Sequence, residues 1–137
     1  AGEPTGDSSG GEELKCLFEQ PGNGLSLCYA WFKSGYVLPR HSHDADCVYY
    51  VIAGDLKLGN QVIGKGDGFF VPCDAPYSYE VGPNGVEILE FRNVSEFHFM
   101  FRNNSDAHWD KMATSISNNK ERWQEESVRP SDRVISS

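Results

Sequence analysis

The sequence predicts an all-β barrel or sandwich followed by one C-terminal α-helix. Short β-prone segments separated by Gly-rich turns fill the middle of the chain, and helical periodicity begins only after about residue 104. The 137 residues, of which 39% are hydrophobic and 12% aromatic, suit a single domain with one core. We therefore expect a flexible tail over 1–13, a barrel over 14–104, a helix over 105–126 and a loose tail over 127–137.

The predicted strands follow one another closely between residues 25 and 91. The segment 48–52 is β-branched and aromatic, as a buried strand should be, and Gly59-Asn60 is a strong hairpin signal. Turns are also expected at Gly54-Asp55, at 64–68 and at 82–85. Many short strands with such turns indicate a barrel or sandwich, with strands expected over 25–32, 48–52, 56–58, 61–63, 69–71, 77–81 and 86–91.

The C-terminal segment has the pattern of an amphipathic helix. Asp106 can cap its first turn. The spacings of Trp109, Met112, Ile116 and Trp123 place these apolar side chains on one face. We expect this helix to pack outside the barrel and to cover one of its openings.

Charge and composition exclude several partners. The chain carries 12 basic and 20 acidic residues, for a net charge of -8, and the basic residues are scattered. Nucleic acids and anionic membranes require clustered Lys and Arg, so neither is an expected partner. No apolar run is long enough to span a membrane. Four cysteines without a C-x-x-C pair, and no signal-peptide pattern, lead us to expect reduced thiols in a cytoplasmic protein.

The most informative pattern runs from Gly35 to Gly54, with His41 and His43 between them. It resembles the first cupin motif, in which Gly, His-x-His, Glu and Gly follow at these spacings, except that Cys47 stands in the place of Glu. Residues 66–77 resemble the second cupin motif: Gly66-Asp67 and Pro72 fit it, whereas Asp74 replaces a Gly and Tyr77 replaces the third His ligand.

The resemblance to cupins implies a double-stranded β-helix, or jelly-roll barrel, holding a metal centre in its interior. It also implies activity on a small molecule, of dioxygenase, lyase or isomerase type, and a homodimer. The substitutions at positions 47 and 77 fall on two of the family's metal ligands, so the chemistry depends on what these residues do.

The histidines have a physical reason to act together. Residues i and i+2 of a strand point to the same face, so His41 and His43 converge if that face lines the barrel. Neutral imidazole binds Zn, Fe, Ni and Cu. Cys47 is either a soft thiolate ligand for such a metal or a neutral core thiol, and the sequence leaves both interpretations open.

The remaining candidates line the same predicted interior. Tyr77 is either a phenolate ligand or, as we favour, an acid or base paired with His43. Tyr49 and Tyr79 lie two residues beyond Cys47 and Tyr77, so they share the inward faces and are predicted to contact the substrate. Glu90 could supply the missing carboxylate.

Three functions remain open at this point. The first is a metal-dependent enzyme that uses His41, His43, Cys47 and Tyr77 on an aromatic or carbonyl-containing molecule. The second is a non-catalytic, small-molecule-binding cupin with a degenerate metal site. The third is a metal-free isomerase or cyclase with Tyr77 and His43 as acid and base.

Overall fold

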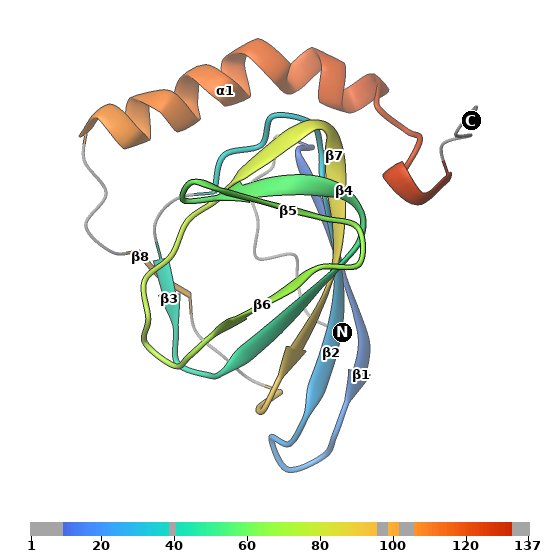
Figure 1. Ribbon diagram of the computed structural model, residues 1–137, viewed down its shortest axis with the longest axis vertical. Coiled ribbons are helices and arrows are strands. Elements are labelled where there is room, and N and C mark those ends of the chain that lie inside the picture. Colours follow the sequence, from blue (N-terminus) through green and yellow to red (C-terminus); the bar gives the residue numbers. More distant parts are fainter. Residues whose placement is uncertain (1–9, 39–40, 96–98, 102–105, 133–137) are drawn as a thin grey trace.

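The protein is described from a computed structural model, which covers residues 10–38, 41–95, 99–101 and 106–132 (Figure 1). Most of the predicted N-terminal tail and residues 133–137 therefore lie outside the described residues. Figure 1 shows a main sheet that curves around an interior, with the short strands β3 and β8 on the opposite side. The predicted all-β architecture with one C-terminal helix is confirmed.

The main sheet is antiparallel and contains six strands. Its order is β1-β2-β7-β4-β5, and β6 pairs with β4 along the same edge as β5. In β4, Cys47, Tyr49 and Val51 are buried while Val48 and Tyr50 are exposed, which is the alternation expected when one face packs on a core. The strands are β1 (Glu12–Glu19), β2 (Ser26–Phe32), β4 (Cys47–Leu58), β5 (Gln61–Gly64), β6 (Gly68–Val71) and β7 (Glu80–Arg92).

A second, two-stranded sheet carries the histidines. It consists of β3 (His41–His43) and β8 (Phe99–Phe101), which pair antiparallel. Isolated bridges join Val37 to Glu80 and His41 to Tyr77, so this sheet is attached to the segment that leads into β7. These pairings bring the two cupin-like motifs side by side.

Two expected turns are instead bulges within long strands. The turn expected at Gly54-Asp55 lies inside β4, and the one expected at 82–85 lies inside β7. Gly54 pairs with Val86 and Leu56 pairs with Val81, so residues 82–85 face a much shorter stretch of β4. The turn signals therefore mark places where regular strand pairing is interrupted. Beyond these places the strands pair regularly again.

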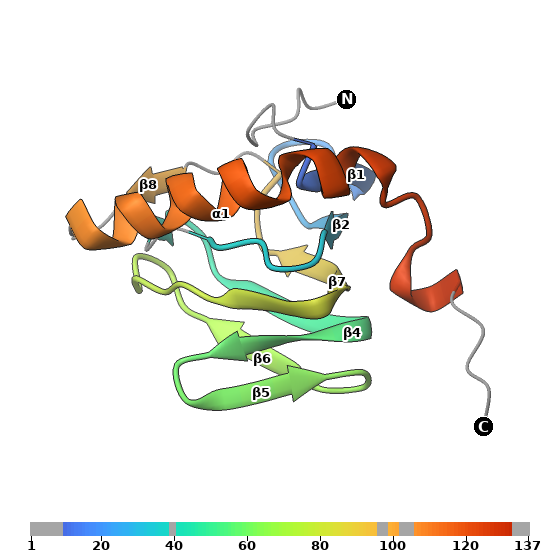
Figure 2. The same ribbon diagram turned by 90° about the horizontal axis from the view of Figure 1, so that it is seen from above.

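Helix α1 (Asp106–Glu125) lies across one end of the barrel (Figures 1 and 2). The fully buried Trp123 packs on Tyr36, with ring centroids 5.7 Å apart, and its indole N–H donates to Ser34 O at 2.7 Å. The 3-10 helix η1 (Pro130–Asp132) follows within the segment that was expected to be loose. Ser131 N donates to Glu87 Oε1 at 2.7 Å, which ties η1 to the outer face of β7.

Candidate functional site

The inner face of the barrel carries a cluster of aromatic and imidazole rings. His41 and His43 come from β3 and are 1% and 6% exposed. Their ring centroids are 4.8 Å apart, as the shared strand face predicts. Main-chain hydrogen bonds between His41 and Tyr77 in both directions, of 3.0 and 2.8 Å, hold Tyr77 beside β3. The ring centroids of these two residues lie 4.4 Å apart.

Tyr77 is the centre of a chain of three hydrogen-bonding groups. Its hydroxyl oxygen lies 3.2 Å from His43 Nε2 and 2.5 Å from the hydroxyl oxygen of Tyr49. Tyr49 is fully buried and stacks on Phe69, whereas Tyr77 is partly exposed. The predicted residues Tyr49, Tyr77 and His43 are therefore brought together, and Tyr77 is the most exposed residue of the three.

The phenols of this cluster hold their protons tightly. Burial raises the pKa of Tyr77 well above its usual value, and the negative charge of Glu90 raises it further. Burial is also the main reason that the pKa values of Tyr49 and Tyr79 are raised. At neutral pH these three side chains are neutral phenols that can donate a hydrogen bond. Tyr77 stays protonated without the help of a further group.

Glu90 belongs to a cluster of polar side chains, with Arg92 and Cys28, that the sequence pattern did not predict. Its Oε2 accepts a hydrogen bond of 2.7 Å from Arg92 Nη2, and Arg92 Nη1 lies 3.0 Å from Cys28 Sγ. Burial raises the pKa of Glu90, and the charge of Arg92 opposes this rise. The i, i+2 spacing of Glu90 and Arg92 was a usable signal for a shared face. Cys28 could not be added without the β2–β7 register, in which it pairs with Glu90.

Cys47 and Tyr79 occupy the core around these groups. Cys47 is buried, and its thiol lies 3.9 Å from the carbonyl oxygen of Ala45. Burial raises the pKa of this thiol. The Tyr79 ring lies 6.1 Å from that of Tyr77 and 6.4 Å from that of Phe69, between ring centroids. Both residues are thus on the inward face that strand parity predicted.

The donor set does not fit the expected metal centre. Across the described residues, no three side chains of His, Cys, Asp or Glu come together in an arrangement that could hold a metal ion. His41 and His43 are adjacent, but neither Cys47 nor Glu90 joins them as a third ligand.

Comparison with known proteins decides the fold. No family model and no curated protein matches the sequence. An RmlC-like cupin from Shewanella frigidimarina NCIMB 400 superposes with a TM-score of 0.57 at 25% identity, covering 66% of this chain and 82% of that one. The protein has the cupin fold. The fold that the two motifs implied is therefore confirmed.

Two enzymes of the same fold are also similar. The polyketide cyclase RemF from Streptomyces resistomycificus superposes with a TM-score of 0.60 at 19% identity, covering 77% of this chain and 84% of that one. Salicylate 1,2-dioxygenase from Pseudoaminobacter salicylatoxidans, solved as gentisate adducts, gives a TM-score of 0.54 at 15% identity. That match covers 69% of this chain and 30% of the dioxygenase. This cupin therefore shares its barrel with enzymes of different chemistry, and the fold alone does not select a reaction.

Proposed function

We propose that this cupin is an enzyme that moves protons on a small aromatic or carbonyl-containing molecule, as an isomerase or cyclase, without a metal ion. The observation that carries the proposal is the position of the Tyr77 hydroxyl, within hydrogen-bonding distance of both His43 Nε2 and the Tyr49 hydroxyl. An acid and a base in direct contact, with the acid partly exposed, are the minimum equipment for such chemistry.

The three groups have distinct roles in this proposal. Tyr77 donates a hydrogen bond to a carbonyl oxygen of the ligand, which stabilises the negative charge that develops there. Tyr49 donates a hydrogen bond to the Tyr77 oxygen and so polarises the Tyr77 O–H group. His43 accepts a proton from the ligand through Nε2, the nitrogen that faces Tyr77. The rings of Tyr79 and Phe69 supply the apolar wall against which an aromatic ligand can pack.

The metal-dependent alternative receives less support from the geometry. His41 and His43 could still share a Zn, Fe, Ni or Cu ion, but the third and fourth ligands would have to be Tyr77 or water. Cys47, which is buried and lies beside the carbonyl oxygen of Ala45, fits better as a core thiol. The non-catalytic alternative needs only the aromatic wall, and it predicts ligand binding without turnover.

The test uses catalysed exchange of α-protons for deuterium in a simple ketone that carries an aromatic ring, such as 2-tetralone, followed by NMR in D₂O. We expect exchange above the buffer rate that survives EDTA treatment. Tyr77→Phe should lower it by about 10²- to 10⁴-fold, the usual contribution of a general acid. Tyr79→Phe is the matched control, because it removes a buried phenol that has no hydrogen bond to His43.

The three hypotheses separate cleanly in this experiment. Exchange that EDTA abolishes and that Zn²⁺ or Fe²⁺ restores would overturn the metal-free proposal in favour of the metal-dependent one. Saturable binding of the ketone with no exchange would favour the non-catalytic cupin. Equal losses in Tyr77→Phe and Tyr79→Phe would show that Tyr77 acts only through packing.

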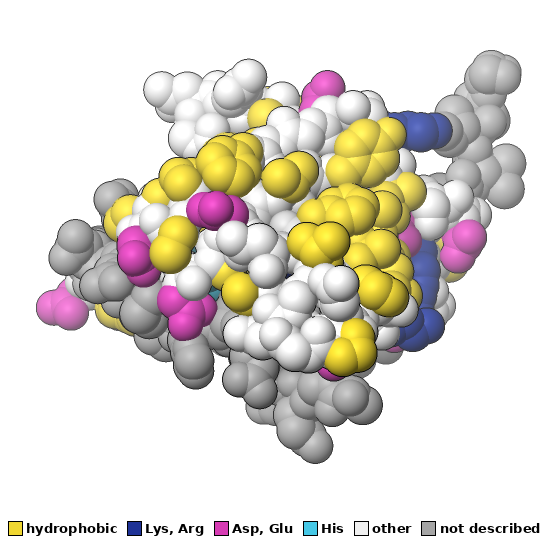
Figure 3. Space-filling view, turned by 90° about the horizontal axis from the view of Figure 1, so that it is seen from below, with side chains coloured by type: hydrophobic (Ala, Val, Ile, Leu, Met, Phe, Trp, Pro, Cys, Tyr) yellow, Lys and Arg dark blue, Asp and Glu magenta, His cyan; other side chains and the backbone are white. Residues whose placement is uncertain are grey.

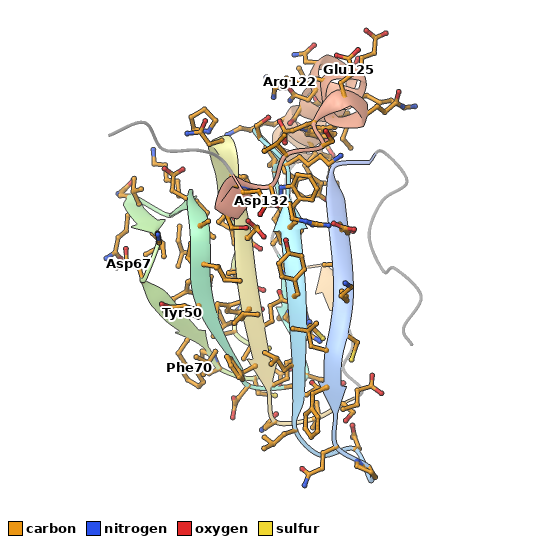
Figure 4. The ribbon with its side chains drawn as sticks, turned by 90° about the vertical axis from the view of Figure 1, so that its right-hand side faces the viewer. Tyr50, Asp67, Phe70, Arg122, Glu125 and Asp132 are labelled. Carbon is orange, nitrogen blue, oxygen red and sulfur yellow. The ribbon has the colours of Figure 1, made fainter. Side chains whose placement is uncertain are left out.

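We also propose that the protein forms a homodimer through the outer face of its main sheet. Register places Phe70, Val48, Phe91, Leu27 and Phe18 in one row across β6, β4, β7, β2 and β1. Four of the five are exposed large hydrophobic residues. Figure 4 shows η1 over one part of this face and Tyr50 and Phe70 on the uncovered part.

The chemistry of this row favours a second copy of the chain as the partner. Figure 3 shows hydrophobic side chains gathered on the side of the molecule where β2 and β7 lie in Figure 1. The row contains no charged residue, so two copies can meet about a two-fold axis without bringing like charges together. Monomers rarely leave a continuous apolar patch of this kind in water.

A further inference from the structure

Two cysteines outside the candidate site face each other across the first hairpin. Cys16 in β1 is the direct register partner of Cys28 in β2. Direct partners on one face of an antiparallel pair have Cα atoms about 4.5–5.5 Å apart, inside the range of about 4.4–6.8 Å seen in disulfides. The sequence does not indicate this pair by a C-x-x-C spacing, because the two cysteines become neighbours only through the register of the two strands.

The two thiols are close enough to act on each other. Cys16 is among the groups that raise the pKa of Cys28, and its own thiol lies 3.4 Å from Glu19 Oε1. Both thiols are free in the structure, and Cys16 is exposed while Cys28 is partly buried. Solvent-borne reagents therefore reach Cys16 first, and the second thiol lies beside it.

The surroundings of Cys28 keep its thiol protonated at neutral pH. Burial raises its pKa to about 11, although the nearby Arg92 guanidinium, 3.0 Å from Sγ, opposes the rise. Such a thiol is a slow nucleophile at neutral pH. Its proximity to Cys16 offsets this, because the second sulfur of a mixed disulfide would be held next to it.

We propose that Cys16 and Cys28 form a reversible modification site, a disulfide across the β1–β2 hairpin made by exchange with a low-molecular-weight disulfide. The Cys16 thiolate attacks one sulfur of the reagent, forms a mixed disulfide and releases one thiolate. The Cys28 thiolate then attacks Cys16 Sγ, closes the intramolecular bond and releases the second thiolate. Two protein thiols lose two electrons and two protons, and the reagent becomes two thiols.

The site is connected to the candidate active site through one side chain. Arg92 contacts Cys28 with Nη1 and Glu90 with Nη2, and the charge of Glu90 acts on the pKa of Tyr77. Closing the disulfide replaces a polar thiol beside Arg92 with a bonded sulfur. Only the Arg92 side chain therefore separates the disulfide from the Glu90 carboxylate.

The experiment treats the purified protein with oxidised glutathione and follows intact mass and free thiols. Cys73→Ser serves as the parent because it removes the other exposed thiol. We expect the parent to lose the mass of two hydrogen atoms and two free thiols, and dithiothreitol to restore both. In Cys28→Ser the mixed disulfide on Cys16 should persist, and in Cys16→Ser neither product should form at a comparable rate.

The rate of closure gives a second, independent readout. Because the thiolate fraction of a group with a pKa of about 11 rises tenfold per pH unit below that value, closure should accelerate about 100-fold from pH 7 to pH 9. A glutathione adduct that persists in the parent, or disulfides that join two chains on a non-reducing gel, would overturn the proposal. Since mass and thiol counts need no substrate, these results do not depend on the proposed enzymatic function.

Discussion

Tyr29 is a residue whose ionisation opposes folding at alkaline pH. Burial and its hydrogen bond to Glu87 raise the pKa of this phenol above the ordinary value of about 10. The unfolded chain therefore releases the proton before the folded chain does, so the free energy of unfolding falls as the pH rises above about 10. We expect a slope below about 1.4 kcal/mol per pH unit from this group, reduced by solvent screening.

Urea denaturation of the wild type and Tyr29→Phe between pH 8 and pH 11 measures this effect. The phenylalanine variant should be less stable at pH 8, because Glu87 loses a hydrogen bond, but its stability should fall less steeply. Parallel curves for the two proteins would contradict the assignment.

Two residues of the cupin-like motifs are fixed by backbone conformation. Gly54 has a φ of 77°, and a Cβ added there would lie 2.1 Å from Gly85 O. Asp74, at the position where the family has Gly, has a φ of 64°, so it adopts the conformation that glycine favours. The departure at Asp74 therefore preserves the geometry of the motif, since Asp tolerates this region better than most residues.

Paired substitutions test this explanation. Gly54→Ala should lower the free energy of unfolding by about 2 kcal/mol or more, from an unfavourable φ and the clash with Gly85. Asp74→Gly should change it by less than about 1 kcal/mol, because relief of strain offsets the greater entropy of the unfolded chain. Chemical denaturation monitored by tryptophan fluorescence measures both. A large loss in Asp74→Gly would show that the Asp side chain itself is needed.

At the scale of single residues, strand parity and motif spacing predicted much of the barrel interior. They predicted His41, His43 and Tyr49 on the interior, because side chains alternate along a strand, and they left Glu90 as a candidate. They could not supply Arg92 as a partner of Glu90 and Cys28, since that requires knowing which strands are neighbours. The roles of Cys47 and Tyr77 also depended on distances between strands, which no local pattern contains.

Among the elements, helix α1 is held to the barrel more by Trp123 than by the rest of its predicted apolar face. Trp123 is fully buried, whereas Trp109, on the same predicted face, is exposed. Helix packing is therefore concentrated in the C-terminal half, where Arg122 Nη2 also donates to Ser34 O at 3.1 Å. The predicted face is therefore buried at Trp123 but not at Trp109, because periodicity could not show how far the barrel extends beneath the helix.

Alanine substitutions of the two tryptophans measure this asymmetry. Trp123→Ala should cost about 3–5 kcal/mol of stability, as removal of a large buried aromatic side chain does. Trp109→Ala should cost clearly less than Trp123→Ala, because 38% of the Trp109 surface is already exposed. Thermal or urea unfolding followed by far-UV circular dichroism gives both values. Equal losses would mean that the whole helix face is packed.

The strands show why element boundaries were harder to predict than element types. The segments expected at 48–52 and 56–58 are one strand, β4, and a bulge at Gly54 lets it continue past the expected turn. Conversely, β1 (Glu12–Glu19) was not expected, because its charged residues weaken the alternating pattern. It lies at the edge of the sheet, where only one neighbour and one face constrain the sequence.

At the scale of the whole molecule, the apolar row on the outer face sets the expected association state. No helix among the described residues combines the length and the hydrophobicity needed to cross a bilayer, and the net charge of -8 disfavours anionic surfaces. Two copies packed through this row would bury Val48, Phe70 and Phe91 against their own counterparts. Sedimentation equilibrium of the wild type should therefore fit a dimer.

Substitution of Val48 with lysine tests which surface forms the dimer. Val48 lies between Phe70 and Phe91 in the row, so Val48→Lys places a charge within the proposed interface, and we expect it to weaken dimerisation by at least 10-fold. Val62→Lys is the matched control: Val62 is 64% exposed but pairs with Lys57, about 30 Å along β4 from Val48. Both changes reduce the net negative charge equally, so overall repulsion cannot explain a difference between them. Dissociation in both variants, or in neither, would place the interface elsewhere.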